Sequence, residues 1–243
     1  MTINHTPTLP IGFDDEPLSA PQRRAAWREA RALIELPRLL AHAPWLLRAP
    51  RGDGQPLLLL PGIGADDRSS APLRHYLTKI GYDARGWGLG RNGGDVEALV
   101  PQVEQLTAAI AAETGQKVTL IGWSLGGVLA RETARRQPDL VAQVLTYGTP
   151  VVGGPAYTLV GHRYSPETLA TITGRIDEVN RTPLQVPLVA FYSRRDGVVS
   201  WRASVDRLTE QVEHVEVRST HVGLGIDPDV WLGIARRLPG TGA

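Results

Sequence analysis

A serine flanked by glycines follows directly after an apolar run of the chain. The pentapeptide Gly122-Trp123-Ser124-Leu125-Gly126 comes after residues 117–121 and begins a stretch whose pattern is typical of a helix through Arg136. A Gly-x-Ser-x-Gly turn between a buried strand and a helix presents a serine hydroxyl at the edge of a parallel sheet, where a base and a substrate can reach it. The chain has 26 glycines, so the pattern gains its weight from this strand–turn–helix setting. The sequence therefore indicates a serine nucleophile.

A serine hydroxyl needs a base to take its proton, and the base needs a partner that fixes its tautomer. Asp196 follows a predicted strand at 188–192, and His221 follows another at 212–217. On a doubly wound sheet, reactive groups gather beyond the carboxyl ends of the strands. Taken singly, Asp196 reads as a turn residue before glycine, and His221 as a capping or packing residue. Because the order serine, aspartate, histidine fits this topology, we interpret them as the acid and the base.

The other histidines are less well placed for this chemistry. His214 lies inside a predicted strand, and His162 lies in a loop-rich segment with no carboxylate to orient it. The remaining three stand in arm or helix contexts without partners: His5, His42 and His75. No two histidines have the spacing of metal ligands, so we expect neither a metal nor another cofactor.

Acyl chemistry at a serine also needs hydrogen-bond donors for the developing oxyanion. The backbone N–H of Leu125, directly after the candidate nucleophile, is the first candidate. The second is the N–H of Ile63 in the loop Pro61-Gly62-Ile63-Gly64, where glycines let the backbone approach a ligand closely. The alternative is that this loop is only a glycine turn out of a buried strand.

Strand and helix signals alternate from residue 55 onward. This alternation predicts an α/β fold whose mostly parallel sheet, of about six strands, is covered by helices on both faces. The segment at about 150–186 lies between two predicted strands and is expected to be an insert rich in loops. Strands are predicted at 57–60, 82–86, 117–121, 141–147, 188–192 and 212–217, and helices at 70–80, 96–113, 125–136 and 229–238.

The N-terminal residues 1–54 differ from the rest and are predicted to be an arm followed by a helical extension, with the main domain at 55–243. Residues 1–20 are rich in proline, and a helix is expected from Pro21, broken by Pro37 and Pro44. We expect its apolar side to pack on the main domain, through Ala26, Ala30, Leu33 and Ile34. The alternative is an arginine-rich helix at 21–48 that makes peripheral contact with anionic lipid.

Composition excludes several classes of protein. The 243 residues are 42% hydrophobic and 21% charged, as in an ordinary globular protein. The formal net charge of +1 gives no preference for nucleic acid. The chain contains no cysteine, which excludes disulfides, cysteine nucleophiles and thiolate metal sites. No stretch approaches 18 apolar residues, so we expect no segment that spans a membrane. With no secretory leader evident, we expect a cytoplasmic protein, with peripheral membrane association left open together with the oligomeric state.

Taken together, these motifs resemble the α/β-hydrolase superfamily, in particular bacterial esterases and lipases of the class 2 and EstA/LipA-like group. The resemblance covers about residues 55–238 and implies that Ser124 is the nucleophile, Asp196 the acid and His221 the base, with Ile63 and Leu125 as oxyanion donors. It also implies carboxylic esters, small molecules or lipids, as substrates. It is carried by the segments 59–64, 86–92, 122–127, 147–150, 193–201 and 220–224.

Two departures from the superfamily pattern affect these expectations. The first two strands of the full fold are not evident, so a reduced sheet is expected. The residue before the serine is Trp123 where histidine is more usual, which we expect to change the shape of the pocket. We assign Trp123, Gly62 and Tyr157 to substrate binding, the last within a short cap formed by the insert.

Three functions stay open on the sequence. The first is hydrolysis of carboxylic esters through an acyl-enzyme on Ser124. The second is an acyltransferase that hands the same acyl group to an alcohol or an amine. The third is a non-catalytic protein of this fold that docks on a membrane or a partner, which the intact set of serine, aspartate and histidine argues against.

Overall fold

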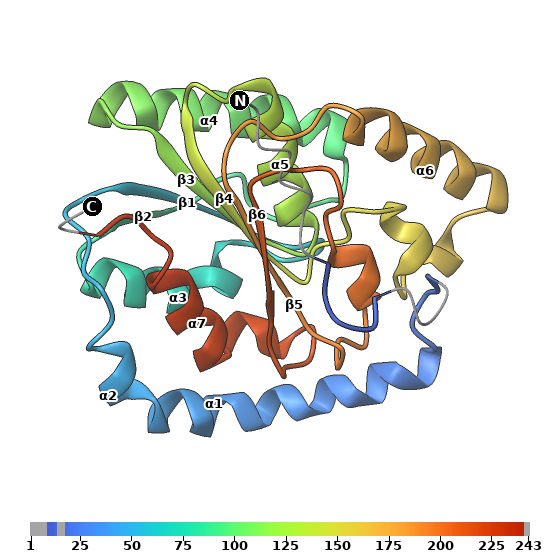
Figure 1. Cartoon of the computed structure of the whole chain (residues 1–243), viewed down its shortest axis with the longest axis horizontal. Helices are drawn as coiled ribbons and strands as arrows, with labels where there is room; N and C mark the ends of the chain where they lie inside the picture. The colour runs from blue at the N-terminus through green and yellow to red at the C-terminus, as the bar shows by residue number, and fades with distance from the viewer. Residues whose placement is uncertain (1–8, 14–17, 241–243) are drawn as a thin grey trace.

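A parallel sheet of six strands forms the centre of the molecule in the computed structural model, which describes residues 9–13 and 18–240 (Figure 1). Each pair of neighbouring strands is parallel, in the order β2-β1-β3-β4-β5-β6. The predicted fold class is confirmed. The strands are β1 (Pro56–Leu60), β2 (Asp83–Gly86), β3 (Val118–Trp123), β4 (Val141–Tyr147), β5 (Leu188–Tyr192) and β6 (Val212–Glu216).

Helices cover both faces of this sheet because its central strands are apolar on both sides. The leucines of β1 alternate between two cores: Leu58 and Leu60 lie in one, and Leu57 and Leu59 in the other. Helices α4 (Val96–Thr114) and α5 (Leu125–Arg136) supply the first core, and α3 (Asp67–Lys79) and α7 (Pro228–Ala235) the second (Figure 1).

Capping residues define where several helices begin. The carboxylates of Asp66, Asp95 and Asp227 accept backbone N–H groups in the first turns of α3, α4 and α7. Such caps satisfy donors that have no partner within the helix. Gly115, at φ +67°, ends α4 in the left-handed region that favours glycine.

The insert between β4 and β5 contains more helix than the sequence analysis predicted. It forms two short 3₁₀ helices, η2 (Gly154–Tyr157) and η3 (Gly161–Arg163), and the long helix α6 (Pro166–Asn180). The hydroxyl of Ser165 accepts the N–H of Thr168, and Pro166 occupies the first turn. None of the residues of α6 is buried, so a strong apolar face, the signal that marks most helices, is missing here.

The N-terminal segment forms a nearly continuous helix along one edge of the molecule (Figure 1): η1 (Arg23–Arg31), α1 (Ala32–Ala41) and α2 (Ala43–Leu46). The predicted break at Pro37 is wrong, because this residue lies within α1 and is exposed. Pro44 stands in the first turn of α2, where a proline N–H is not needed.

The predicted packing of the N-terminal helix is also wrong. Ala25, Ala32 and Glu35 form its buried side. By contrast, Leu33 is 82% exposed and Ile34 58% exposed, and the alanines assigned to the apolar side, Ala26 and Ala30, are exposed as well. The small alanines allow the helix to approach the main domain closely, which turns the larger apolar side chains towards solvent.

Residues 9–13 of the N-terminal arm are anchored to the main domain. Phe13 is buried, and Arg202 donates to the carbonyl oxygens of Gly12 and Phe13. The predictions for residues 1–8 and 14–17, including His5, lie outside the described residues, and the division of the chain at 54 and 55 stays a prediction. Within the described ranges, no helix has both the length and the apolar character needed to cross a membrane.

Candidate active site

Ser124 occupies a strained turn between β3 and α5. Its backbone angles are φ 51° and ψ −122°, and no other non-glycine residue in the described part of the chain has a positive φ. Side chains rarely adopt this region because of steric repulsion, and such strain concentrates at functional sites. The turn matches the arrangement in which a serine hydroxyl stands at the carboxyl edge of a sheet.

The glycines of the turn are required by close packing. A Cβ atom at Gly126 would lie 2.1 Å from the carbonyl oxygen of Leu60, at the end of β1. A Cβ atom at Gly122 would lie 2.3 Å from the Cα atom of Gly127. The strand, the turn and the helix can therefore meet only where these positions have no side chain.

Asp196 and His221 form a buried hydrogen-bonded pair. The Oδ2 atom of Asp196 lies 2.8 Å from Nδ1 of His221, and both residues are less than a tenth exposed. The other carboxylate oxygen, Oδ1, accepts the N–H groups of Val198 and Val199 at 2.8 and 2.7 Å. These bonds fix the carboxylate, and the carboxylate in turn orients the imidazole, with Nδ1–H as donor and Nε2 free to accept a proton.

The segment Tyr147-Gly148-Thr149 lies between the histidine and the serine and contacts both. The N–H of Ser124 donates to the carbonyl of Tyr147 at 2.9 Å, and the hydroxyl of Thr149 donates to the carbonyl of Ser124 at 3.0 Å. Between these two residues, a Cβ atom at Gly148 would lie 3.0 Å from Nδ1 of His221. The structure therefore brings Ser124, Asp196 and His221 to the same end of the sheet.

Glu29 is a candidate site residue that the sequence analysis missed. Its Oε1 accepts the N–H groups of Gly197 at 3.0 Å and His221 at 3.1 Å, and its Oε2 accepts that of Val222 at 2.8 Å. One carboxylate from η1 thus holds together the loops that carry Asp196 and His221. The only available signal was that Glu29 and Glu35 are the sole acidic residues between Arg23 and Arg51.

Electrostatics favour the protonated form of His221. Burial lowers the pKa of the imidazole, but attraction to Asp196, the hydrogen bond with Asp196 and the negative charge of Glu29 outweigh it and raise the pKa above its ordinary value. A base with this environment is suited to holding a proton transiently beside a serine.

The two candidate oxyanion donors lie on the loop after β1 and at the start of α5. A Cβ atom at Gly62 would lie 3.2 Å from Cβ of Ser124, so the loop that contains Ile63 runs beside the serine. Leu125 is the first residue of α5, whose N-terminal N–H groups carry a partial positive charge. The assignment of Ile63 and Leu125 stays a prediction that this placement supports.

Two of the residues assigned to substrate binding, Trp123 and Tyr157, have different surroundings in the structure: by the polar and ring contacts of the described residues, Trp123 contacts His221, and Tyr157 does not. Trp123 packs against His221, with ring centroids 5.6 Å apart, and its indole Nε1–H donates to the carbonyl of His221 at 3.3 Å. Tyr157 belongs to η2, where its carbonyl accepts the N–H of Ser200. Among its polar and ring contacts in the described residues, none reaches Ser124, Asp196 or His221. Substrate binding by Tyr157, Trp123 and Gly62 stays a prediction.

The competing histidines have other roles in the structure. His214 accepts the backbone N–H of Asp206 through Nε2, and Nδ1 of His162 bonds to the carbonyl of Leu159. Nδ1 of His42 bonds to the carbonyl of Arg38 within the N-terminal helix. Across residues 9–13 and 18–240, no group of three or more histidine, aspartate or glutamate side chains could hold a metal ion.

Comparison with known proteins assigns the chain to a family. A family model described as "Alpha/beta hydrolase family" matches residues 57–238. The chain belongs to the α/β-hydrolase family.

Two curated relatives are pimeloyl-[acyl-carrier protein] methyl ester esterases. That of Aromatoleum aromaticum is 33% identical over 129 residues, 52% of this chain and 50% of the relative. That of Shewanella sp. is 33% identical over 110 residues, 44% of this chain and 39% of the relative. The chain thus spans about half, or less, of the length of these relatives.

Solved structures show the same fold at low sequence identity. Lipase B of Aspergillus fumigatus superposes with a TM-score of 0.58 at 17% identity, over 78% of this chain and 54% of that one. The Bacillus licheniformis lipase BlEst2 gives a TM-score of 0.56 at 13% identity, over 76% of this chain and 91% of that one.

Proposed function

We propose that this protein is a serine hydrolase of carboxylic esters, acting through an acyl-enzyme on Ser124. The observation that carries the proposal is the 2.8 Å hydrogen bond between Asp196 and His221, next to a serine held in a strained turn. A buried aspartate that fixes a histidine tautomer has a direct use when that histidine takes a proton from a nucleophile.

The proposed reaction proceeds in two halves. Nε2 of His221 takes the hydroxyl proton while Oγ of Ser124 attacks the ester carbonyl, and Asp196 stabilises the imidazolium that forms. The N–H groups of Ile63 and Leu125 stabilise the negative oxygen of the tetrahedral intermediate. His221 then gives its proton to the leaving alcohol, which leaves an acyl group on Ser124. A water molecule, deprotonated by His221, attacks the carbonyl of this acyl group. The bond from the acyl carbon to Oγ of Ser124 then breaks, His221 returns its proton to Oγ, and the acid is released.

Esters of carboxylic acids are the substrate class that the comparisons favour. The curated relatives are named as esterases of a methyl ester, and the two lipases have the same fold. The insert that contains α6 lies at the position where such enzymes have a cap over the active site. A short cap is consistent with an acyl group of limited length. We assign the reaction to the carboxylic-ester hydrolases.

The test is hydrolysis of p-nitrophenyl esters from acetate to palmitate by the wild type and by Ser124→Ala. We expect turnover in the wild type and a loss on the order of 10⁴–10⁶ in kcat in the variant. The chain length that gives the highest kcat/KM would measure the acyl pocket. Full activity in Ser124→Ala would contradict the proposal.

A fluorophosphonate probe and added nucleophiles separate the remaining alternatives. We expect the probe to label wild-type protein at Ser124, whereas a non-catalytic protein would stay unlabelled. With an alcohol or amine added at millimolar concentration, the free acid should remain the main product. A dominant transfer product would instead identify an acyltransferase with the same acyl-enzyme.

A further inference from the structure

A cavity of about 720 Å³ lies between the N-terminal helix and the loops that follow β5 and β6. Five arginines line it: Arg28, Arg31 and Arg38 from the helix, and Arg195 and Arg218 from the loops. Neither Ser124, Asp196 nor His221 lines the cavity, so it is separate from the candidate active site.

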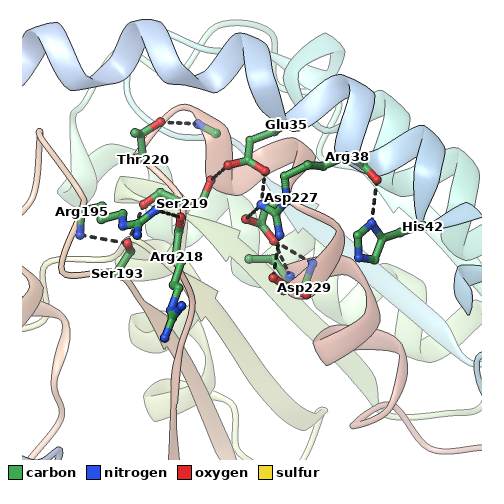
Figure 2. Close-up of polar contacts among 12 residues, drawn as sticks. Glu35, Arg38, His42, Ser193, Arg195, Arg218, Ser219, Thr220, Asp227 and Asp229 are labelled. Carbon is green, nitrogen blue, oxygen red and sulfur yellow. Dashed lines mark hydrogen bonds and ion pairs between the residues drawn. The ribbon is translucent and has the colours of Figure 1, made fainter.

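Most of this positive charge is not neutralised within the protein. Arg38 forms ion pairs with Glu35, Asp227 and Asp229, as Figure 2 shows. The other four, Arg28, Arg31, Arg195 and Arg218, pair with no carboxylate among the described residues. Four exposed guanidinium groups without a carboxylate partner concentrate positive charge around one cavity, and this charge would attract an anion.

An exposed apolar surface lies on the same helix. Leu33, Leu36 and Leu40 recur at spacings of three and four residues, so they share one face of α1, and they are 82%, 54% and 70% exposed. Ile34, which is 58% exposed, lines the arginine cavity and adjoins this face. Soluble monomers rarely expose so many large apolar side chains on one element, and such a surface marks an interaction site.

Tryptophan side chains stand near both ends of the helix. Trp27 is 84% exposed in η1, and Trp45 is 55% exposed in α2. Tryptophan is favoured at the boundary between water and lipid, because its ring is apolar while its N–H remains hydrated. A helix with leucines on one face, arginines on its other side and tryptophans near its ends has the composition of an interfacial helix.

We propose that residues Arg23–Leu47 form a docking surface for an anionic phospholipid bilayer, in which the leucine face enters the interface and the arginine cavity takes phosphate headgroups. A bilayer fits better than a protein partner because the exposed apolar side chains extend along the whole helix, from Trp27 to Leu47, and are accompanied by exposed arginines. The cavity also includes Arg195, next to Asp196, and Thr220, next to His221. Docking would therefore bring the loops of the candidate active site close to lipid.

The proposal can be tested without catalysis. Full-length protein carrying Ser124→Ala is sedimented with vesicles of equal parts phosphatidylglycerol and phosphatidylcholine, and with vesicles of phosphatidylcholine alone. We expect binding to the anionic vesicles to be at least ~10-fold tighter and to weaken as salt is raised. Because this readout does not use ester hydrolysis, it is independent of the proposed function.

Three sets of substitutions locate the surface. Replacing Arg28, Arg31, Arg195 and Arg218 with glutamine should weaken binding to anionic vesicles by at least ~10-fold. Replacing Leu33, Leu36 and Leu40 with glutamine should weaken binding to both kinds of vesicle by a similar factor. A matched control removes four exposed charges elsewhere and should bind as the parent protein does: Lys79, Lys117, Arg136 and Arg181, each changed to glutamine.

Circular dichroism melting of each variant checks that the fold is intact, which we expect because the substituted arginine, lysine and leucine side chains are exposed. The proposal would be overturned by a parent protein that binds neither kind of vesicle, or by a control that loses as much binding as the cavity variant. Binding to an acidic carrier protein, without binding to vesicles, would also overturn it and assign the surface to a protein partner.

Discussion

The carboxylate of Glu29 accepts the backbone N–H of His221 at 3.1 Å, although 191 residues separate them in the chain. The same oxygen accepts the N–H of Gly197, next to Asp196. The N-terminal helix thus holds the two loops that carry the candidate acid and base, and its negative charge adds to the forces that raise the pKa of His221. This segment supports the site from outside the region that matches the family model.

Glu29→Gln should shift the pH dependence of activity. Because the pKa of His221 is raised, we expect the acid limb of kcat/KM in the wild type to lie above about 6.5, the ordinary value for histidine. Glutamine removes the negative charge, so the protonated imidazole is less favoured and the limb should move to lower pH. We also expect kcat/KM at the plateau to fall about tenfold, since hydrogen bonds to the loops weaken. The measurement is kcat/KM for a p-nitrophenyl ester across pH.

Glu178→Gln is the matched control, because Glu178 is exposed in α6 and, among the residues that the structure describes, forms an ion pair only with Arg181. Its pH profile should coincide with that of the wild type. An unchanged acid limb in Glu29→Gln would show that Glu29 has a structural role only.

Asp196→Asn should remove most of the activity while leaving the fold intact. The Oδ1 atom of asparagine can still accept the N–H groups of Val198 and Val199. Its amide, however, would present N–H donors to Nδ1 of His221, which fixes the wrong tautomer and removes the attraction to the imidazolium. We expect kcat to fall on the order of 10⁴-fold, with a melting temperature close to that of the wild type. A loss smaller than tenfold would argue against the role of Asp196 as the acid.

Local patterns in the sequence predicted the sheet well, because β1, β3, β4 and β5 are largely apolar and buried. By contrast, β2 and β6 contain several charged residues and are only partly buried. The predicted bounds of β4 and β5 agree with the structure, and the other strands differ by one or two residues. The predicted strands place Ser124, Asp196 and His221 after strand ends. What local patterns could not predict depends on contacts between distant segments, such as Glu29 with His221.

The errors in the N-terminal segment have the same physical origin. Burial of Leu33 and Ile34 is predicted because apolar side chains usually face the core, yet Ala25 and Ala32 face it and these larger side chains do not. Helix α6 was missed although Ser165, Pro166 and Glu167 form a typical helix start. The sequence signal of an exposed helix such as α6 lies in its capping residues and not in an apolar face. Hydrophobic periodicity therefore does not detect it.

Two glycine-to-alanine substitutions should have opposite effects on stability. In Gly126→Ala, the new methyl group would lie 2.1 Å from the carbonyl oxygen of Leu60, so backbone must move, and we expect a loss of about 3 kcal/mol or more together with lost activity. In Gly174→Ala, within α6, nothing lies within 4 Å of the new methyl group, so we expect a gain of about 0.5–1 kcal/mol. Urea denaturation measures both. Equal effects at the two positions would contradict the close packing of the serine turn.

The buried ion pair between Arg131 of α5 and Asp206 should be costly to break. Nη1 of Arg131 lies 2.6 Å from Oδ2 of Asp206, and the two side chains are 5% and 3% exposed. Asp206 also accepts the N–H groups of Leu208 and Thr209. Asp206→Asn would leave a buried guanidinium without a countercharge, so we expect a loss of about 3–5 kcal/mol in the free energy of unfolding at pH 7.

The cost of Asp206→Asn should depend on pH in one direction. Burial alone would raise the pKa of Asp206, but attraction to Arg131 and hydrogen bonds from Thr209 and Leu208 lower it well below its ordinary value. A lowered pKa in the folded state contributes stability that is present above the pKa of the unfolded state, about 3.9, and is lost as the pH falls further. The difference between wild type and variant should therefore be constant from pH 7 to about 4.5 and shrink below about pH 4. Urea denaturation from pH 7 to pH 3 measures it, with Glu178→Gln as an exposed-pair control that should change stability by less than about 1 kcal/mol. A difference that grows as the pH falls would mean that Asp206 is protonated in the folded protein.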